Sequence, residues 1–417
     1  MRAKRMVLWA GLSLIFLIFL AGCGKEETEE QQEGREKEVL HMVGLNVGKK
    51  VLEEAVREFN EGNDQVEIAC EYYDMEEYKS ALARKMAVNE EPDLFFAWQS
   101  GFLEAYVNRD KVMALDEFMD ADLKWQEWFT KQDLTDVSFG GRIYGIPSTK
   151  CITLAFYNKE LFQKYGVEIP RTYKEFQEIC RTFKDNGVTP LYLNSVPWAA
   201  GQMFLQVLIG ACGQEMVNSQ GLEDIPWGTE KFRQAAQQLS DWYREGYIPE
   251  DFLGMEGERV SAQDTAIYIT GNWLAKMMDE SWGAFLIPPA KEENEGIAIG
   301  GNDRCYAISK TCSNPKEAFD FLELLSSEKY RRKLLTEEGM IPAGKLDIEE
   351  AGLTELEKRC YELMQNTKQF CLNMDVRFGP EFGDLFNESA QAIIAGEDCG
   401  EVLRNLEQFG KQETEKE

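Results

Sequence analysis

The strongest constraint on the fold is the regular alternation of strand and helix patterns near the start of the sequence. The segment "VLHMVGLN" has the apolar character of a buried strand, and the residues after it place apolar side chains at helical spacing. The alternation repeats, with three strand patterns and two helix patterns at 39–46, 47–63, 65–73, 75–90 and 92–98. Consecutive βαβ units predict an α/β fold with a mostly parallel sheet, helices on its faces and right-handed crossovers.

Length and charge limit the possible partners. A chain of 417 residues is long enough for two domains. It carries 74 acidic and 45 basic residues, a formal net charge of −29. Such an excess of acid repels nucleic acid phosphates and anionic lipid headgroups. We therefore expect neither to be a partner.

The first 22 residues have the pattern of an export signal. The basic residues Arg2, Lys4 and Arg5 precede an apolar run that ends at Gly22. The sequence "LAGC" follows and resembles the lipobox of bacterial lipoproteins, in which the cysteine, here Cys23, is lipidated. An uncleaved membrane anchor is the alternative. We predict a signal peptide over 1–22 and a lipid anchor on Cys23.

A short acidic segment separates this anchor from the folded part. Residues 24–38 hold seven acids and three bases and no aliphatic or aromatic side chain. They cannot bury enough apolar surface to fold, and their like charges repel each other. Residues 23–38 are therefore predicted to be the lipidated cysteine and a disordered tether.

Cysteine and histidine usage argues against several kinds of site. No CxxC spacing occurs among the ten cysteines, which gives a metal site little support. We expect most of the nine cysteines after Cys23 to be small buried apolar residues, with disulfides as the alternative. The single histidine, His41, lies in an apolar strand pattern, whereas general acid–base catalysis most often uses histidine. No nucleotide-binding motif is present, so we expect no cofactor.

Several segments, in sequence order, carry a resemblance to a known family. The segment "GGRIYGIPSTKCITLAFYNKELFQKYGVEIPRTYKEF" places "YGIP" before a strand, an Asn-Lys pair, a short helix and a "P-T-Y-x-E-F" motif, with Tyr173 where the family usually has Trp. The segments are 92–107, 140–176, 184–193, 269–278, 300–327 and 380–408. Together they resemble the bacterial extracellular solute-binding proteins (family 1, carbohydrate type), the binding subunits of ABC importers, which are distantly similar to maltose-binding protein.

The resemblance implies a type II periplasmic-binding-protein-like fold. Each of two lobes is then a mostly parallel sheet flanked by helices, and hinge strands join the lobes. By analogy, lobe 1 comprises 39–150 plus 304–327, lobe 2 comprises 151–303 plus 328–410, and 411–417 form a polar tail.

The resemblance also implies a function without chemistry. A mono- or oligosaccharide binds between the lobes, the lobes close over it, and the closed form delivers it to the membrane subunits of an ABC permease. The protein is then a monomer on the outer face of the cytoplasmic membrane, anchored through Cys23 in a Gram-positive bacterium. Alternatives are a binding protein for a non-sugar solute, a receptor coupled to a sensor, and a surface glycosidase that uses two carboxylates.

Most candidate ligand-binding residues lie beside predicted strand ends, where α/β sheets meet their ligands, whereas Asp375 and Arg377 come from the late helical part of the chain. Aromatic faces suit the C–H faces of sugars, and planar polar groups pair with adjacent hydroxyls. The candidates are Asn46, Trp98, Gln99, Ser100, Ser148, Thr149, Trp198, Asn272, Trp273, Asn302, Asp303, Arg304, Asp375 and Arg377. Among the tryptophans, Trp273 is favoured for stacking because of its family position after a "GN" turn.

Each candidate has a structural alternative. Tryptophans are usually core or rim residues. Asp303 and Arg304 are also placed to pair as a salt bridge at the hinge, and Asp375 and Arg377 to form a surface ion pair.

Overall fold

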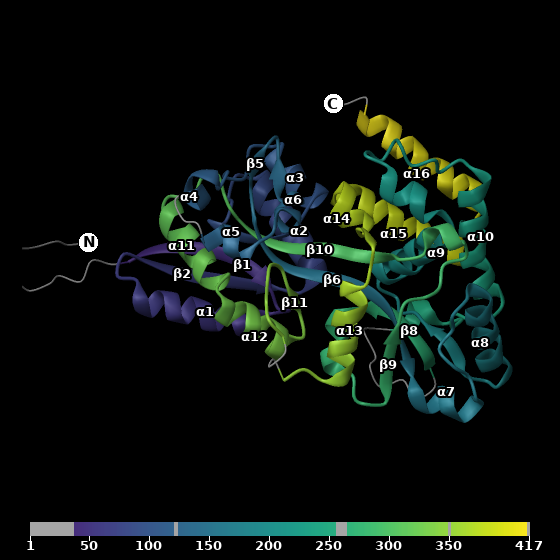
Figure 1. Cartoon of the computed structure of the whole chain (residues 1–417). Coiled ribbons are helices and arrows are strands. Elements are labelled where there is room, and N and C mark those ends of the chain that lie inside the picture. Colours follow the sequence, from purple (N-terminus) through teal and green to yellow (C-terminus); the bar gives the residue numbers. More distant parts are fainter. Residues whose placement is uncertain (1–36, 121–123, 256–264, 349–351, 415–417) are drawn as a thin grey trace, which may run out of the picture. The chain divides into compact units, whose positions relative to one another are not determined.

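Two long strands, β6 (Ile146–Asn158) and β10 (Ile297–Ile308), run through the centre of the computed structural model (Figure 1). The structure describes residues 37–120, 124–255, 265–348 and 352–414. The predicted signal peptide, Cys23 and the tether up to residue 36 lie outside the described residues. Residues 37–417 form one compact unit.

Within the described residues, ten strands beside β6 and β10 complete the sheets. They are β1 (Glu38–Leu45), β2 (Val66–Tyr73), β3 (Leu94–Trp98), β4 (Ser138–Phe139), β5 (Arg142–Ile143), β7 (Thr189–Tyr192), β8 (Thr265–Gly271), β9 (Trp282–Phe285), β11 (Ile341–Pro342) and β12 (Gln369–Cys371). The main sheet has the strand order β2-β1-β3-β10-β6-β8-β7, and β4 and β5 form a separate hairpin. The predicted parallel βαβ start is confirmed, because β1 pairs in parallel with both β2 and β3.

Helices occupy most of the remaining described chain. In the first half they are α1 (Lys49–Gly62), α2 (Met75–Ala87), α3 (Gly101–Val107), α4 (Asp116–Asp120), α5 (Lys124–Trp128), α6 (Lys131–Thr135), α7 (Lys159–Tyr165), α8 (Tyr173–Asp185) and α9 (Pro197–Asn218). The second half holds α10 (Glu230–Arg244), η1 (Phe252–Gly254), η2 (Asn272–Met277), η3 (Glu292–Asn294), α11 (Pro315–Leu325), α12 (Glu328–Glu338), α13 (Glu355–Gln365), α14 (Met374–Phe378), α15 (Pro380–Ile394) and α16 (Cys399–Thr414).

Periodicity and capping explain why these helices form and where they begin. In α1 the residues Val51, Leu52, Ala55 and Phe59 are buried on one face, as the helical spacing predicts. α8 begins at the predicted capping box, in which the Thr172 hydroxyl accepts from the Glu175 N–H and the glutamate side chain returns to the cap. The sequence therefore specifies these helices locally.

The central strands divide into two halves that belong to different cores. The last residues of β10 pair with β3, whereas Ile297–Ile299 at its start pair with β12. Similarly, the start of β6 pairs with β11, and its end pairs with β8 and β9. One apolar core includes Leu40, Phe59 and Leu94, and another includes Phe176, Leu208 and Phe386. The strands thus connect two lobes, as in a type II binding-protein fold.

Glycine allows β10 to cross close to β6. Gly300 has φ +135°, and a Cβ added there would lie 2.2 Å from the Cys151 carbonyl oxygen. Only glycine combines this backbone conformation with so close an approach.

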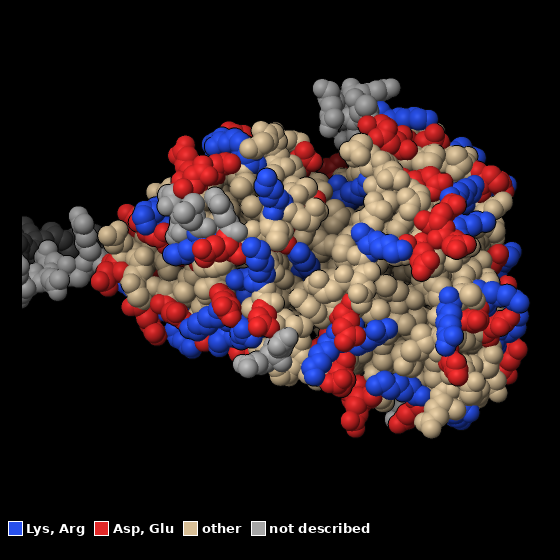
Figure 2. Space-filling model, in the orientation of Figure 1, with Lys and Arg blue, Asp and Glu red and all other residues tan. Residues whose placement is uncertain are grey.

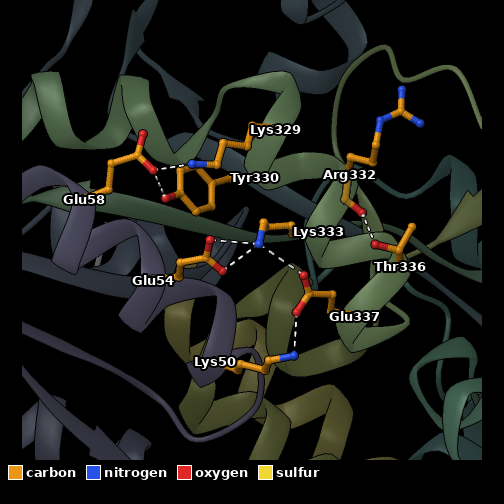
Figure 3. Close-up of polar contacts among 9 residues, drawn as sticks. All are labelled: Lys50, Glu54, Glu58, Lys329, Tyr330, Arg332, Lys333, Thr336 and Glu337. Atoms are coloured by element: carbon orange, nitrogen blue, oxygen red, sulfur yellow. Dashed lines mark hydrogen bonds and ion pairs between the residues drawn. The ribbon is translucent and has the colours of Figure 1, made fainter.

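The position of α12 differs from the predicted lobe boundary at residue 328. Its Tyr330 and Leu334 are buried in the same core as α1, and not with the elements assigned to lobe 2. Polar contacts join α12 to α1 along their length (Figure 3). Lys333 Nζ lies 2.6 Å from Glu54 Oε2, and Lys50 Nζ lies 2.6 Å from Glu337 Oε2. α12 therefore packs with lobe 1, and the chain next crosses at β11.

The C-terminal end also differs from the prediction. Residues 411–414, assigned to a polar tail, continue helix α16. Among the described residues, no helix combines the length and apolar character required to span a membrane. Acidic and basic side chains are interspersed over the face shown in Figure 2.

Candidate functional site

The junction between the lobes brings several predicted residues together at adjacent strand ends. The parallel strands β1 and β3 end at Leu45 and Trp98. β10 runs antiparallel to β3 with Arg304 opposite Trp98, and it places Arg304 opposite Thr149 of β6. The carboxyl end of β3 thus meets the middle of both crossing strands, which is where an α/β sheet offers a ligand site.

A buried polar cluster lies at this meeting point. Arg304 Nε is 3.1 Å from Asp303 Oδ2, and only 6% of Arg304 and 7% of Asp303 is exposed. The Thr149 hydroxyl donates to the same carboxylate at 3.5 Å, and the Gln99 side-chain amide donates to the Arg304 carbonyl at 2.9 Å. The predicted alternative of a salt bridge between Asp303 and Arg304 is therefore what the structure contains.

Burial controls the protonation chemistry of Asp303. Removal from water raises the pKa of its carboxyl, the Arg304 guanidinium opposes this rise, and the charge of Asp375 adds to it. Arg304 is thus the main group that favours the ionised form of the Asp303 carboxyl, and the Thr149 hydroxyl adds a smaller effect in the same direction.

Trp98 links this cluster to helix α14. Its indole is buried and packs edge-on against Phe96 and Phe102. Lys79 Nζ of α2 lies 5.2 Å from the centre of a Trp98 ring and 3.0 Å from Asp375 Oδ2 of α14. Lys79, which no sequence pattern singles out, therefore connects two predicted residues from opposite lobes.

A hollow of about 970 Å³ opens beside this lysine. Elements of both lobes line it: α2 and α3 on one side, and residues 220–223, α15 and the end of α16 on the other. Its lining includes Lys79, Ser100, Tyr106, Asp136, Arg377, Phe378 and Asp384. Two predicted residues, Ser100 and Arg377, thus line the hollow directly.

Two carboxyls of the hollow have shifted protonation equilibria. Burial raises the pKa of Asp136, while a hydrogen bond from Asn302 Nδ2 to its Oδ2, 2.7 Å long, opposes the rise. Burial also raises the pKa of Asp384, and the positive charge of Lys79 opposes that rise. Asn302, a predicted residue, is therefore in contact with the lining although it does not line the hollow itself.

Arg377 is held mainly by backbone carbonyl groups. Its guanidinium donates to the Met216 carbonyl at 2.5 Å, and to the carbonyl and hydroxyl of Ser219 at 2.5 and 3.0 Å. Asp375 pairs with Lys79. Asp375 and Arg377 therefore have different partners, and the surface ion pair between them that was the predicted alternative is not what the structure contains.

The two predicted tryptophans of lobe 2 form a pair of their own. Trp198, at the start of α9, and Trp273, in η2, are half-buried and pack edge to face with ring centres 6.1 Å apart. The Trp273 ring covers Gly271, where an added Cβ would lie 1.9 Å from it. Neither ring lines the 970 Å³ hollow.

The remaining predicted residues make structural contacts. Asn272 Oδ1 accepts from the Ile152 N–H at 2.9 Å and fixes η2 to β6. Asn46 donates to Asp74 Oδ1 at 2.7 Å, and the Ser148 carbonyl accepts from the Ala343 N–H at 2.8 Å. A ligand role for these residues stays a prediction.

Sequence reasoning missed Lys79, Asp136 and Asp384. Lys79 lies on an ordinary amphipathic helix, and Asp136 and Asp384 carry no motif. Only the long-range packing of α2, α6 and α15 brings them to one place. Within the described part of the chain, no group of three or more His, Cys, Asp or Glu side chains is arranged to hold a metal ion.

The nine described cysteines are free thiols, and all but Cys70 are buried. Burial raises the pKa of Cys70 to about 11 and that of Cys360 to about 12, so the reactive thiolate is scarce near neutral pH.

We expect a protein that lacks residues 1–23 to give nine thiols with a colorimetric reagent in denaturant without reductant. The native protein should react far more slowly at pH 8. A denatured count that rises after reduction would show that disulfides exist.

The chain is similar in sequence and in fold to known binding proteins. The family model described as "Bacterial extracellular solute-binding protein" matches residues 46–332. The melibiose/raffinose/stachyose-binding protein of Bacillus subtilis is 21% identical over 81% of this chain and 80% of its own length. The maltodextrin-binding protein of the same organism is 23% identical over 89% and 90%. A solved chitin oligosaccharide binding protein superimposes with a TM-score of 0.83 at 18% identity and covers 90% of this chain and 98% of its own.

Proposed function

Because the chain belongs to the bacterial extracellular solute-binding protein family, we propose that it captures a mono- or oligosaccharide between its lobes for an ABC importer. Members of this family are binding proteins, and their lobes close around a solute. Two curated relatives are named for binding sugars, and a solved structure of the same fold is a chitin oligosaccharide binding protein. A sugar is therefore the favoured ligand class.

The observation that carries the proposal is the hollow of about 970 Å³ lined by both lobes. Its volume lies in the range of small-molecule sites. The half-buried Phe378 and Phe409 side chains offer apolar surface, and Ser100, Asp136 and Asp384 offer hydroxyl and carboxyl groups. This mixture fits a molecule with alternating C–H and O–H surface.

The partners and location follow from the same proposal. Lipidation of Cys23 would hold the protein, as a monomer, at the outer face of the cytoplasmic membrane of a Gram-positive bacterium. The closed form would deliver its sugar to the membrane subunits of an ABC permease. We assign no reaction to the protein.

The proposal is tested by thermal unfolding of the protein without residues 1–23. The panel contains mono- and oligosaccharides, with amino acids, peptides and polyamines as controls. A ligand at 100 times its dissociation constant should add about 2.7 kcal/mol to the free energy of unfolding and raise Tm by a few degrees. A shift with non-sugars alone would contradict the sugar assignment. Release of new reducing ends from an oligosaccharide would favour the glycosidase alternative.

A further inference from the structure

Helix α14 is fixed to lobe 2 although it lies at the lobe junction. The Arg377 guanidinium binds the Met216 and Ser219 carbonyls at the end of α9. On the next helix, α15, a Cβ added to Gly383 would lie 2.1 Å from Asp375 Cβ, so α14 and α15 are in backbone-close contact. α14 should therefore move with lobe 2 when the lobes separate.

The same helix also packs against lobe 1. Val376 is buried in a core cluster with Tyr78, Trp98 and Phe102 of lobe 1. Two further contacts involve an ion pair and the backbone. Asp375 Oδ2 is 3.0 Å from Lys79 Nζ, and both side chains are less than one-fifth exposed. At the start of α3, a Cβ added to Gly101 would lie 2.5 Å from the Arg377 carbonyl oxygen and 2.9 Å from the Gly379 nitrogen. The second contact exists only because residue 101 has no side chain.

We propose that these two contacts form a latch, made of the Lys79–Asp375 pair and the Gly101 backbone contact, that favours closed lobes before any ligand binds. The ion pair is shielded from water and Lys79 also lies over the Trp98 ring, so its attraction is screened less than that of a surface pair. The backbone contact adds packing that a single methyl group would prevent.

The latch would influence the affinity for the ligand as well as the fraction of protein with closed lobes. This step rests on the proposed function, in which the closed form binds the solute. If only the closed form binds, the apparent dissociation constant equals the intrinsic one divided by the closed fraction. The residues of the latch thus tune affinity without having to touch the ligand.

A second ion pair joins the same two lobes and provides a matched control. Arg109 Nη2 lies 3.8 Å from Glu381 Oε1 of α15, but their side chains are 64% and 71% exposed. An exposed pair of this kind contributes little to stability. Arg109→Gln should therefore leave the closed fraction unchanged, whereas Lys79→Met should lower the ratio of closed to open protein about tenfold.

The test uses ligand-free protein without residues 1–23, so it does not depend on finding a sugar. Small-angle X-ray scattering and amide hydrogen exchange are measured for Gly101→Ala, Lys79→Met, Asp375→Asn and Arg109→Gln. We expect the first three to increase the radius of gyration and to speed exchange in α3 and α14. The Lys79→Met/Asp375→Asn double variant should open no further than either single variant, and Lys79→Asp/Asp375→Lys should restore part of the closure.

Residue 101 has no positive φ, so alanine is compatible with its backbone conformation in an open form. If Gly101→Ala nevertheless fails to fold, the Lys79→Met and Asp375→Asn variants test the latch without it. Scattering and exchange equal to wild type in Lys79→Met and Asp375→Asn would overturn the latch. Opening in these variants without any sugar binding by wild type would retain the latch and contradict the proposed function instead.

Discussion

Replacing Arg304 by leucine is expected to lower the free energy of unfolding by about 3–5 kcal/mol, the usual cost of removing one partner of a buried ion pair. Asp303 would keep its buried position without the guanidinium that lies 3.1 Å from its Oδ2. The Thr149 hydroxyl, at 3.5 Å, offers only a weak hydrogen bond in compensation. Urea unfolding at pH 8 measures the loss.

The loss should depend on pH in a defined direction. Burial already raises the pKa of Asp303, with Arg304 opposing the rise, so removal of the cation should raise this pKa further. A group whose pKa is raised by folding stabilises the folded state below its unfolded pKa, and this contribution is lost as pH rises through the folded value. We therefore expect a smaller deficit at pH 5 than at pH 8.

The matched control is Arg304→Leu in an Asp303→Asn background. Because a neutral side chain needs no counterion, the second substitution should recover much of the stability in a double-mutant cycle. An equal cost of Arg304→Leu in both backgrounds, or a deficit that grows at lower pH, would show that the pair does not act as a buried ion pair.

The sequence predicts the elements of this fold well where local patterns decide them. The β1–α1–β2 order and the capping box at Thr172 follow from periodicity and capping. The two long strands cross the predicted lobe boundaries at residues 151 and 304, because β6 already begins at Ile146 and β10 at Ile297. Pro147 and Gly300 interrupt the apolar pattern, so the sequence does not show these longer strands. Pro147 is accommodated because β11 pairs only with Thr149 and Lys150, so one side of the proline lacks a strand neighbour.

The candidate site was predictable only in part. Strand ends can be predicted from the sequence, and the candidates chosen there include Trp98, Thr149 and Arg304, which are neighbours in the structure. Tertiary packing decides which buried polar side chains bond to other protein groups. For Gln99, the side-chain amide donates to the Arg304 carbonyl, a contact that the sequence does not predict. Lys79 and Asp375 are 296 residues apart in the sequence, a separation over which local periodicity carries no information.

Trp273→Ala is expected to weaken sugar binding by roughly 1–3 kcal/mol, a loss of about 5- to 150-fold in affinity. The half-buried ring is held rigidly by Trp198 at 6.1 Å and by its position over Gly271. A ring that is already ordered offers a flat apolar face at little further entropic cost. Calorimetry with the sugar found in the thermal screen measures the effect.

The control is Trp128→Phe, because Trp128 is also half-buried but packs on Trp125 in the core of lobe 1. The Trp128→Phe variant should keep wild-type affinity.

Since Trp273 does not line the 970 Å³ hollow, the Trp273→Ala variant also shows whether the ligand reaches beyond the hollow. A large loss would mean that the sugar extends beyond the hollow to the tryptophan pair. Wild-type affinity in Trp273→Ala would remove the stacking assignment, and a loss in Ser100→Ala would then confine the sugar to the hollow between α3 and α15.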